Sequence, residues 1–380
     1  MPPQFFHYNL ELVQPDYESS LTDLIIELDY LRKKPLHGTT PAPIFFQLKS
    51  IFHTLESIGS ARIEGNHTTI AEFIETKINQ EANPTEEIVE IQNLEKAMSF
   101  IDEHIQETPM NRIFLSELHK HVVQNLVREG SQTPGEYRVK NLAITQSEHV
   151  PPDFIQVAPY MQELFDFINK NDSPKYDLLK TAISHHRFVW IHPFDNGNGR
   201  TVRLLTYAML VKQGFNVNVG RIINPTAIFC SNRKQYYEAL SWADRGTKEG
   251  VLRWCEYVLG GLKTEIEKID RLLDYEYLKK HILVPAVKYS LERKFITDIE
   301  AKILEVAIEK KILQASDVKK ILPDKIPAEI SRIIRRIKEK KMLQTENEKS
   351  RKYTMSFSNS YLLRGVIKML DENNFLPMKE

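Results

Sequence analysis

The stretch HPFDNGNGRTVR, residues 192–203, places a titratable base, a glycine-flanked turn and two arginines within one short segment. Gly197 and Gly199 flank Asn198 directly before a mostly apolar run, so the backbone can turn sharply and aim consecutive N–H groups at one point. The apolar run has helical spacing, which puts the turn at a helix N-terminus, where unpaired N–H groups and the helix dipole favour an anion. The stretch therefore predicts a phosphate-binding loop.

Three side chains of the stretch supply the chemistry that such a loop needs. Arg200 and Arg203 are three residues apart, so they project from one side of the first helical turn and can bind phosphate oxygens in a bidentate manner. His192 precedes the turn, and the near-neutral pKa of an ordinary imidazole suits a general base whose target is a hydroxyl. For the glycine-flanked tripeptide alone, a surface turn with a capping asparagine is the alternative interpretation.

The whole stretch resembles the signature of the Fic family, His-x-Phe-x-Asp/Glu-Gly-Asn-Gly-Arg-x-x-Arg, and departs from it only at the acidic position, which is Asn196 here. The resemblance implies transfer of AMP from ATP to a Ser, Thr or Tyr hydroxyl of a protein, with possible self-modification. It assigns His192 as the base and Arg203 as the ligand of the γ-phosphate. The other phosphate ligands that it implies are Gly197, Asn198, Gly199 and Arg200. Removal of AMP, or transfer of another nucleotide or of phosphocholine, shares the signature and stays open.

Two places in the sequence bear on metal binding. Family members hold Mg²⁺ with the acid that is replaced by Asn196, and an amide oxygen is a weaker, neutral ligand for this hard cation. We therefore expect Mg²⁺ dependence with a weaker apparent affinity than an acid would give, with Asp195 assisting if the loop turns it inward. His185 and His186 do not have the spacing of common zinc motifs and are interpreted as core or supporting histidines.

A segment far upstream bears on one of the arginines. Residues 42–66 have helical periodicity, and the Gly-Asn pair at their end is typical of a helix C-terminus. That end, SARIEGN at 60–66, resembles the Ser/Thr-x-x-x-Glu-Gly/Asn inhibitory motif of one class of Fic proteins. The resemblance implies that Ser60 and Glu64 are inhibitory and that Glu64 pairs with Arg203, because a carboxylate on a phosphate site competes with the ligand it mimics. A solvated acid at the helix end is the alternative.

The segment Val139–Val150 shows short alternating apolar positions, which predicts a small β-hairpin. It resembles the Fic flap, which clamps the nucleotide and aligns a target segment by edge pairing; a stray surface hairpin is the alternative. The resemblance also puts Tyr236 and Tyr237 beside the adenine, where one of the two can stack, unless both are core residues. Asp244 falls near the position at which related enzymes have an Asn that contacts the base. The flap residues implied to contact the nucleotide are Leu142, Ala143, Ile144 and Thr145.

The pattern changes from about Lys280 onward, where three short helices are followed by two strand-like runs within Met342–Phe357. This order resembles a winged helix-turn-helix. Between Glu329 and Lys341 there are six basic residues against two acidic ones, so DNA binding through residues 329–352 is one interpretation and a solvated helix face is the other. The three expected helices are Ala301–Ala307, Ala315–Ile321 and Pro327–Lys340.

The composition limits the classes of protein to which the chain can belong. The chain is 42% hydrophobic and 27% charged, typical of a globular protein, and its 51 basic and 51 acidic residues give no global field for nucleic acid or anionic lipid. Two cysteines exclude a disulfide framework and a cysteine-rich zinc site. No run is long and apolar enough for a membrane span, and the N-terminus does not resemble a secretion signal, so we expect a cytoplasmic protein.

The expected fold is mainly α: a Fic-type helical domain with a small β-hairpin flap, followed by a winged helix-turn-helix. We expect an N-terminal helical region with the inhibitory helix at 1–110, the catalytic domain at 111–280 and the winged-helix-like domain at 281–380. His119, on a helix predicted over Met110–Val127, is interpreted as a surface or partly buried residue. A homodimer that holds the inhibited state is a further expectation.

Overall fold

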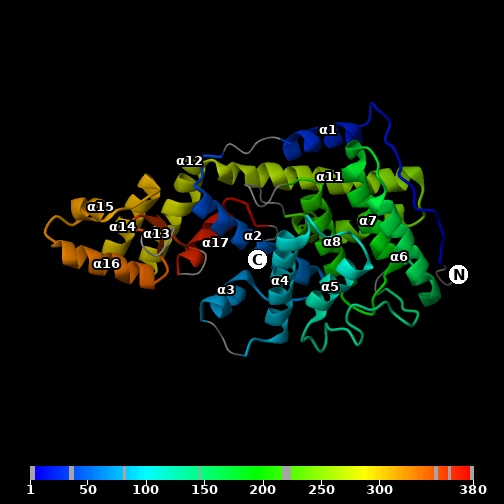
Figure 1. The fold of residues 1–380 in the computed structure, drawn as a ribbon, viewed down its shortest axis with the longest axis horizontal. Helices are drawn as coiled ribbons and strands as arrows, with labels where there is room; N and C mark the ends of the chain where they lie inside the picture. Colours follow the sequence, from blue (N-terminus) through cyan, green and yellow to red (C-terminus); the bar gives the residue numbers. More distant parts are fainter. Residues whose placement is uncertain are drawn as a thin grey trace. The chain divides into compact units, whose positions relative to one another are not determined.

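The computed structural model describes residues 5–33, 38–79, 83–144, 147–215, 224–345, 350–357 and 361–376. Within these ranges the chain is mainly helical, and its strands form one two-stranded antiparallel sheet (Figure 1). The mainly α fold class is confirmed. In the described part of the chain, no helix has both the length and the apolar character that a membrane span requires.

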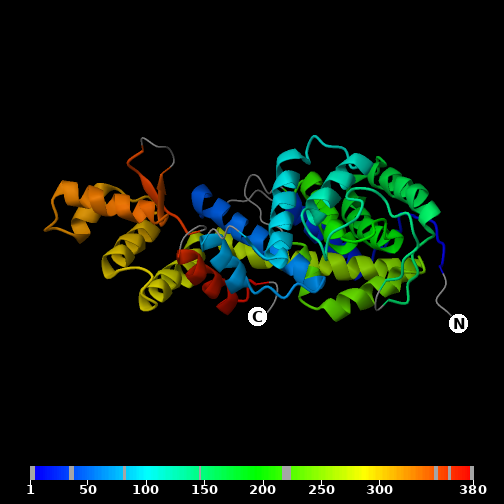
Figure 2. The same ribbon diagram turned by 90° about the horizontal axis from the view of Figure 1, so that it is seen from below.

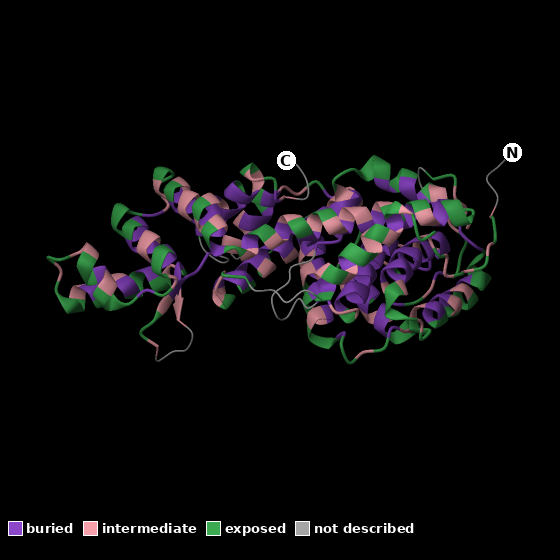
Figure 3. Cartoon of the chain, turned by 90° about the horizontal axis from the view of Figure 1, so that it is seen from above, coloured by how far each residue is buried: buried purple, intermediate pink, exposed green. Residues whose placement is uncertain are grey.

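The chain forms two compact units, each assembled from separate segments. The first comprises Met1–Pro35, Glu56–Thr68 and Pro84–Glu267, and the second comprises Leu36–Leu55, Thr69–Asn83 and Lys268–Glu380. The expected three-part division of the chain stays a prediction. Buried residues line the inward faces of the helices within each unit (Figure 3).

The first unit is helical in its described part. Its centre is α8, Asn198–Lys212, which contacts α4, α5 and α7 and is buried over most of its length. This agrees with the apolar residues that the sequence places on several faces of that helix. The elements of this unit are α1 Ser20–Lys33, the end of α2 Ala42–Ile63, α4 Glu86–His104, α5 Arg112–Val123, α6 Phe154–Asn169, η1 Pro174–Tyr176, α7 Asp177–Ile191, α8, α9 Thr226–Cys230, α10 Arg233–Ala243 and most of α11 Lys248–Asp270.

Side-chain caps determine where two of the scaffold helices begin. Thr85 accepts from the Ile88 N–H at the start of α4, and Asn111 accepts from the Phe114 N–H at 3.0 Å at the start of α5. Each bond satisfies an N–H group that has no partner inside the helix. The helix predicted from Met110 is therefore confirmed to within two residues at its start.

The second unit combines helices with the small sheet. Antiparallel β1 and β2 pair Leu343 with Met355 and Thr345 with Tyr353, next to α14 and α16 (Figure 2). The predicted order of three helices and two strands is confirmed, and α15 has the predicted bounds. The elements are the start of α2, α3 Ile70–Asn79, η2 Arg271–Leu273, α12 Tyr275–Leu278, the π-helical η3 Lys279–Leu283, α13 Val284–Glu292, α14 Asp298–Lys310, α15 Ala315–Ile321, α16 Pro327–Glu339, β1 Leu343–Thr345, β2 Tyr353–Met355 and α17 Leu362–Glu372.

The expected hairpin at Val139–Val150 is wrong for the residues that the structure describes there, 139–144 and 147–150, which contain no strand. A two-stranded hairpin without further support is marginal in water. Side-chain bonds hold the segment instead: Arg138 donates to the carbonyls of Lys140 and Pro152, and Asn141 Nδ2 donates to Asp153 Oδ2 at 2.8 Å. The flap segment is thus anchored at its base without a ladder of its own.

Candidate functional site

The loop before α8 is closed by its own residues and by the end of α5. Gly197 has φ +73°, in the left-handed region, and a Cβ built on it would lie 3.1 Å from Val123 Cγ1, so glycine is required there. Asn198 Nδ2 donates to the Phe194 carbonyl, and Asn198 Oδ1 accepts from the Phe194 N–H, both at 2.9 Å. Among the described residues, no capping side chain bonds the start of α8. The first N–H groups of this helix therefore face an anion-binding position.

His192 lies at the C-cap of α7 in a left-handed conformation, with φ 52° and ψ 63°. This strained backbone is held in place because its N–H donates to the Phe188 carbonyl and its carbonyl accepts from Arg138 Nε, both at 2.9 Å. Burial lowers the pKa of the imidazole to about 4, against smaller opposing effects of the Val189 backbone and the Glu64 charge. The ring is therefore uncharged at neutral pH and can accept a proton.

His119 supports the loop, and the prediction that it lies at or near the surface is wrong. It is fully buried and stacks on Phe194, with ring centroids 3.8 Å apart and planes 2° apart. Its Nδ1 accepts from the Gly135 N–H at 2.8 Å, and its Nε2 donates to the Asn196 carbonyl at 3.0 Å. Burial lowers the pKa of this imidazole to about 4 as well. A neutral His119 thus joins α5, the base of the flap segment and the loop.

Arg203 is buried on α8 and is fully engaged by the end of α2. Its Nε donates to Ser60 Oγ at 2.8 Å, and its Nη2 donates to the Ser60 carbonyl at 2.9 Å and to Glu64 Oε1 at 2.6 Å. Burial acts to raise the pKa of the Glu64 carboxyl, but the charges of Arg203 and Arg200 outweigh it, so this pKa is lowered and the group is ionised. The contact between Glu64 and Arg203 that the sequence led us to expect is present.

The Glu64 carboxylate also lies over the first turn of α8. A Cβ built on Gly199 would be 2.1 Å from Glu64 Oε1 and 3.1 Å from Arg203 Nη1. Any larger residue at this position would displace the carboxylate, so the glycine makes room for it. An acid of the chain itself therefore stands at the helix N-terminus where an anion is favoured.

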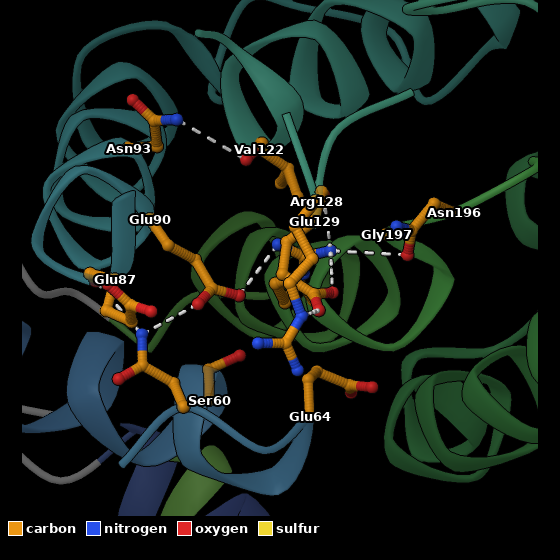
Figure 4. Close-up of polar contacts among 12 residues, drawn as sticks. Ser60, Glu64, Glu87, Glu90, Asn93, Val122, Arg128, Glu129, Asn196 and Gly197 are labelled. Atoms are coloured by element: carbon orange, nitrogen blue, oxygen red, sulfur yellow. Dashed lines mark hydrogen bonds and ion pairs between the residues drawn. The ribbon is translucent and has the colours of Figure 1, made fainter. Parts of the chain in front are cut away.

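Arg200 does not point to the same place as Arg203, although the sequence predicts that both project to one side. Its Nη1 donates to Glu90 Oε1 on α4 at 2.7 Å, and its Nη2 donates to the Glu129 carbonyl at 2.9 Å. Figure 4 shows Glu90 and Glu129 directed at this guanidinium. The side chains of Arg200 and Glu90 are 1% and 3% exposed, so this is a buried ion pair, and its formation explains why the two arginines diverge.

Glu90 was not identified from the sequence, although one signal was available. It lies on the buried stripe of α4, one turn before Leu94, in a helix whose other buried positions are apolar except Asn93. An acid on such a stripe requires a buried partner. Burial raises the pKa of the Glu90 carboxyl, opposed by the Arg200 charge and by a hydrogen bond from Asn66.

The residues implied to contact the adenine differ in burial and in their partners within the protein. Tyr236 is buried, and its hydroxyl bonds His185 Nε2 at 2.9 Å, whereas Tyr237 is 40% exposed. Asp244 Oδ1 pairs with His186 Nε2 at 3.0 Å. The two histidines are thus occupied by neighbouring side chains. In the flap segment Leu142 and Ile144 are half-buried and Ala143 is exposed, while Thr145 lies outside the described residues.

The loop side chains do not fit a Mg²⁺ site of their own. Asn196 Oδ1 accepts from the Gly197 N–H at 2.7 Å and lies 3.4 Å from a nitrogen of Arg200, a cation. The Asp195 carboxylate turns away, to Ser131 Oγ at 2.5 Å and the Gln132 N–H at 3.0 Å. Over the described ranges there is no cluster of three His, Cys, Asp or Glu side chains suited to a metal. Phosphate oxygens of a ligand are the remaining partners for the cation.

Comparison with known families bears on the same region. Residues 109–210, which include the loop, match the model of the Fic/DOC family. The match with a protein adenylyltransferase Fic of Drosophila willistoni is 31% identical over 208 residues, 53% of this chain and 38% of that relative. The match with the protein of the same name from Nematostella vectensis is 30% identical over 202 residues, which are 51% of this chain and 44% of that relative. The chain thus aligns with less than half of the length of each relative.

Solved structures share the fold of this chain. A Fic family protein from Desulfovibrio desulfuricans has a TM-score of 0.55 at 19% identity, covering 92% of this chain and 98% of that one. A Fic domain containing signaling protein from Bacteroides thetaiotaomicron has a TM-score of 0.52 at 18% identity, covering 67% and 97%. At these identities the likeness concerns the fold alone.

We predict that His119→Phe destabilises the protein by about 2–4 kcal/mol, measured by urea unfolding. Phenylalanine keeps the stack on Phe194 but leaves the Gly135 N–H and the Asn196 carbonyl buried without a partner, each at a cost of roughly 1–3 kcal/mol. His121→Phe, on the half-buried side of the same helix, is the control and should change the unfolding free energy by less than about 0.5 kcal/mol. Equal losses in the two variants would contradict the role given to His119.

Proposed function

We propose that this chain is an autoinhibited protein adenylyltransferase, which transfers AMP from ATP to a Ser, Thr or Tyr hydroxyl of a protein and releases pyrophosphate. The observation that carries the proposal is the Glu64 carboxylate on Arg203 at the N-terminus of α8, because an acid held there marks the position of an anionic ligand. The names of the curated relatives, protein adenylyltransferase Fic, support the same chemistry.

In this proposal the hydroxyl oxygen attacks the α-phosphorus of ATP, and the bond from that phosphorus to the pyrophosphate oxygen breaks. The hydroxyl proton passes to the neutral imidazole of His192. The N–H groups of Gly197, Asn198 and Gly199 bind phosphate oxygens, and Arg203 holds the γ-phosphate once Glu64 has left. Catalysis then consists mainly of orienting ATP and balancing its charge.

Inhibition follows from the geometry of Arg203. Its Nη2 and Nε are both bonded to the end of α2, so a γ-phosphate must displace the Glu64 carboxylate to reach the guanidinium. The partly exposed Glu64 carboxylate and the phosphate compete for the same charge. ATP without its γ-phosphate held is misoriented for in-line attack, which is why we expect little transfer in the closed state.

We predict that Glu64→Gly raises self-labelling with AMP roughly tenfold or more when the protein is incubated with ATP and Mg²⁺, because Arg203 becomes available. Intact-mass spectrometry detects the added adenylyl group. Glu64→Gln keeps the size of the side chain without its charge and should give an intermediate rise. Adding His192→Ala to Glu64→Gly should abolish labelling. Equal labelling of wild type and Glu64→Gly would refute the inhibition.

A second prediction concerns pH. An imidazole acts as a base only above its pKa, and the lowered pKa of His192, about 4, keeps it unprotonated well below neutral pH. The Glu64 charge acts to raise this pKa, so removing Glu64 does not bring it closer to neutral. The labelling rate of Glu64→Gly should therefore be independent of pH from about 6 to 8 and decline only below about 5. Half-maximal labelling near pH 6.5, the pKa of a free imidazole, would contradict this.

A second candidate function concerns the second unit. We propose that the exposed face of α16 binds the phosphate backbone of DNA. Ile330, Ile334 and Ile337 form the buried side of this helix, and Arg335, Arg336 and Lys338 are exposed. Over the described ranges, none of these three cations has an ion pair, whereas Lys340 pairs with Glu300 at 2.5 Å. Unpaired cations on one helix face are the arrangement that phosphate contacts need.

We predict that the chain shifts duplex DNA at low salt and that the affinity falls steeply as salt rises. The double substitution of Arg335 and Arg336 by Ala should weaken binding and lower the slope of log K against log salt by about 2, since each phosphate contact contributes roughly 0.9. Replacing the exposed Lys288 and Lys302 by Ala removes the same charge from α13 and α14 and should leave the slope unchanged. Absence of binding at low salt would exclude this function.

A further inference from the structure

The turn that follows Glu64 is attached to the motif by a second route. Gly65 ends α2 with φ +106°, and Asn66 comes next, 7% exposed. Asn66 Nδ2 donates to Glu90 Oε2 at 2.7 Å and to the Glu87 carbonyl at 2.9 Å, while its Oδ1 accepts from the Thr68 N–H at 2.9 Å. The turn at 64–68 is therefore bound to α4 by an asparagine whose side-chain bonds are all inside the protein.

Glu90 connects that turn to the motif. One of its oxygens accepts from Asn66 and the other from Arg200, so a single buried carboxylate bridges the turn and the first arginine of α8 (Figure 4). Each of these bonds involves a charged group in a buried place, where such bonds are strongest and their loss is most costly. The two arginines of α8 are thus held by two acids, Glu64 and Glu90, that lie on either side of one turn.

We propose that Glu90 is a positioning residue for inhibition: through Asn66 it holds the turn closed and thereby keeps the Glu64 carboxylate on Arg203. Glu64 reaches Arg203 from the last turn of α2, which frays most easily in a helix and needs an external anchor. Asn66 supplies this anchor, and Arg200 holds the anchor point Glu90 from the other side, while its own Nη2 donates to the Glu129 carbonyl. The proposal rests on the autoinhibition proposed above and adds the contact that determines its strength.

The same arrangement gives Arg200 a different role from the one expected from the sequence. Its Nη1 and Nη2 donate to Glu90 and Glu129, so its charge is used within the protein. Withdrawing it toward a phosphate would leave the Glu90 carboxylate buried without its cation, at a large cost. In the closed state Arg200 therefore anchors the turn, and Arg203 is the arginine that exchanges partners.

The test compares Asn66→Ala with Asn93→Ala. Asn93 is a matched control because it lies one turn along α4 from Glu90, is 2% exposed and donates to the Gln124 carbonyl at 2.7 Å. Figure 4 shows its other bond, to the Val122 carbonyl, which points away from the turn at 64–68. Hydrogen–deuterium exchange of the backbone amides at 64–68 measures the opening of the turn directly, and self-labelling with ATP measures the effect of that opening on AMP transfer. Unfolding by urea shows whether both variants are folded.

We expect Asn66→Ala to accelerate exchange at 64–68 and to raise labelling roughly tenfold to a hundredfold, the range for losing a hydrogen bond to a charged group. Asn93→Ala should do neither. In a Glu64→Gly background Asn66→Ala should add nothing to labelling, because the residue that it positions is gone.

Two results would overturn the proposal. The first is exchange at 64–68 that is the same in Asn66→Ala as in wild type. The second is faster exchange without any rise in labelling while Glu64→Gly is active. If Glu64→Gly is itself inactive, the adenylyltransferase proposal fails, and the exchange of Asn66→Ala still decides whether the Asn66 side chain, with its bond to Glu90, holds the turn.

Discussion

Two arginines one helical turn apart are both buried at the start of α8, and the arrangement of the first unit depends on neutralising them. A buried guanidinium without a carboxylate costs about 3–5 kcal/mol, so each must find one. Arg203 takes Glu64 from the end of α2, and Arg200 takes Glu90 from α4. These pairs bring two segments that are distant in sequence to the same turn of α8, which is how a short motif determines the packing of a much larger unit.

The two pairs differ in how readily they can exchange. The Glu90 side chain is 3% exposed and lies in the interior of a helix, whereas that of Glu64 is 28% exposed and belongs to the last turn before a glycine. An acid at a helix end can move without unfolding its helix, but an acid in the middle of α4 cannot. Of the two arginines, Arg203 is therefore the one that a phosphate can reach at low cost. The proposed autoinhibition requires this asymmetry, because a site with two immovable acids would bind no nucleotide.

Local patterns predicted the helices well, and long-range pairings were predicted only where a motif named them. The bounds of α15 and the caps of α4 and α5 follow from neighbouring residues, so periodicity and capping were sufficient. The pair between Glu64 and Arg203 was expected only because both ends belong to recognisable motifs. Glu90 and His119 belong to no such motif. Their partners lie on other segments of the chain, and local sequence patterns do not show which helices pack against each other. The flap hairpin failed for a related reason, since two strands gain little stability without a third partner.

The position of the proposed base is determined by the flap segment as much as by its own helix. His192 adopts φ 52°, which a histidine holds only when its surroundings impose it. Arg138, at the base of the flap segment, bonds the His192 carbonyl through Nε and the Pro193 carbonyl through its own N–H at 2.8 Å. A shift of the flap segment would therefore move the backbone that aims the imidazole. If the flap segment aligns a protein target, as the family resemblance implies, the same arginine couples the arrival of that target to the orientation of the base.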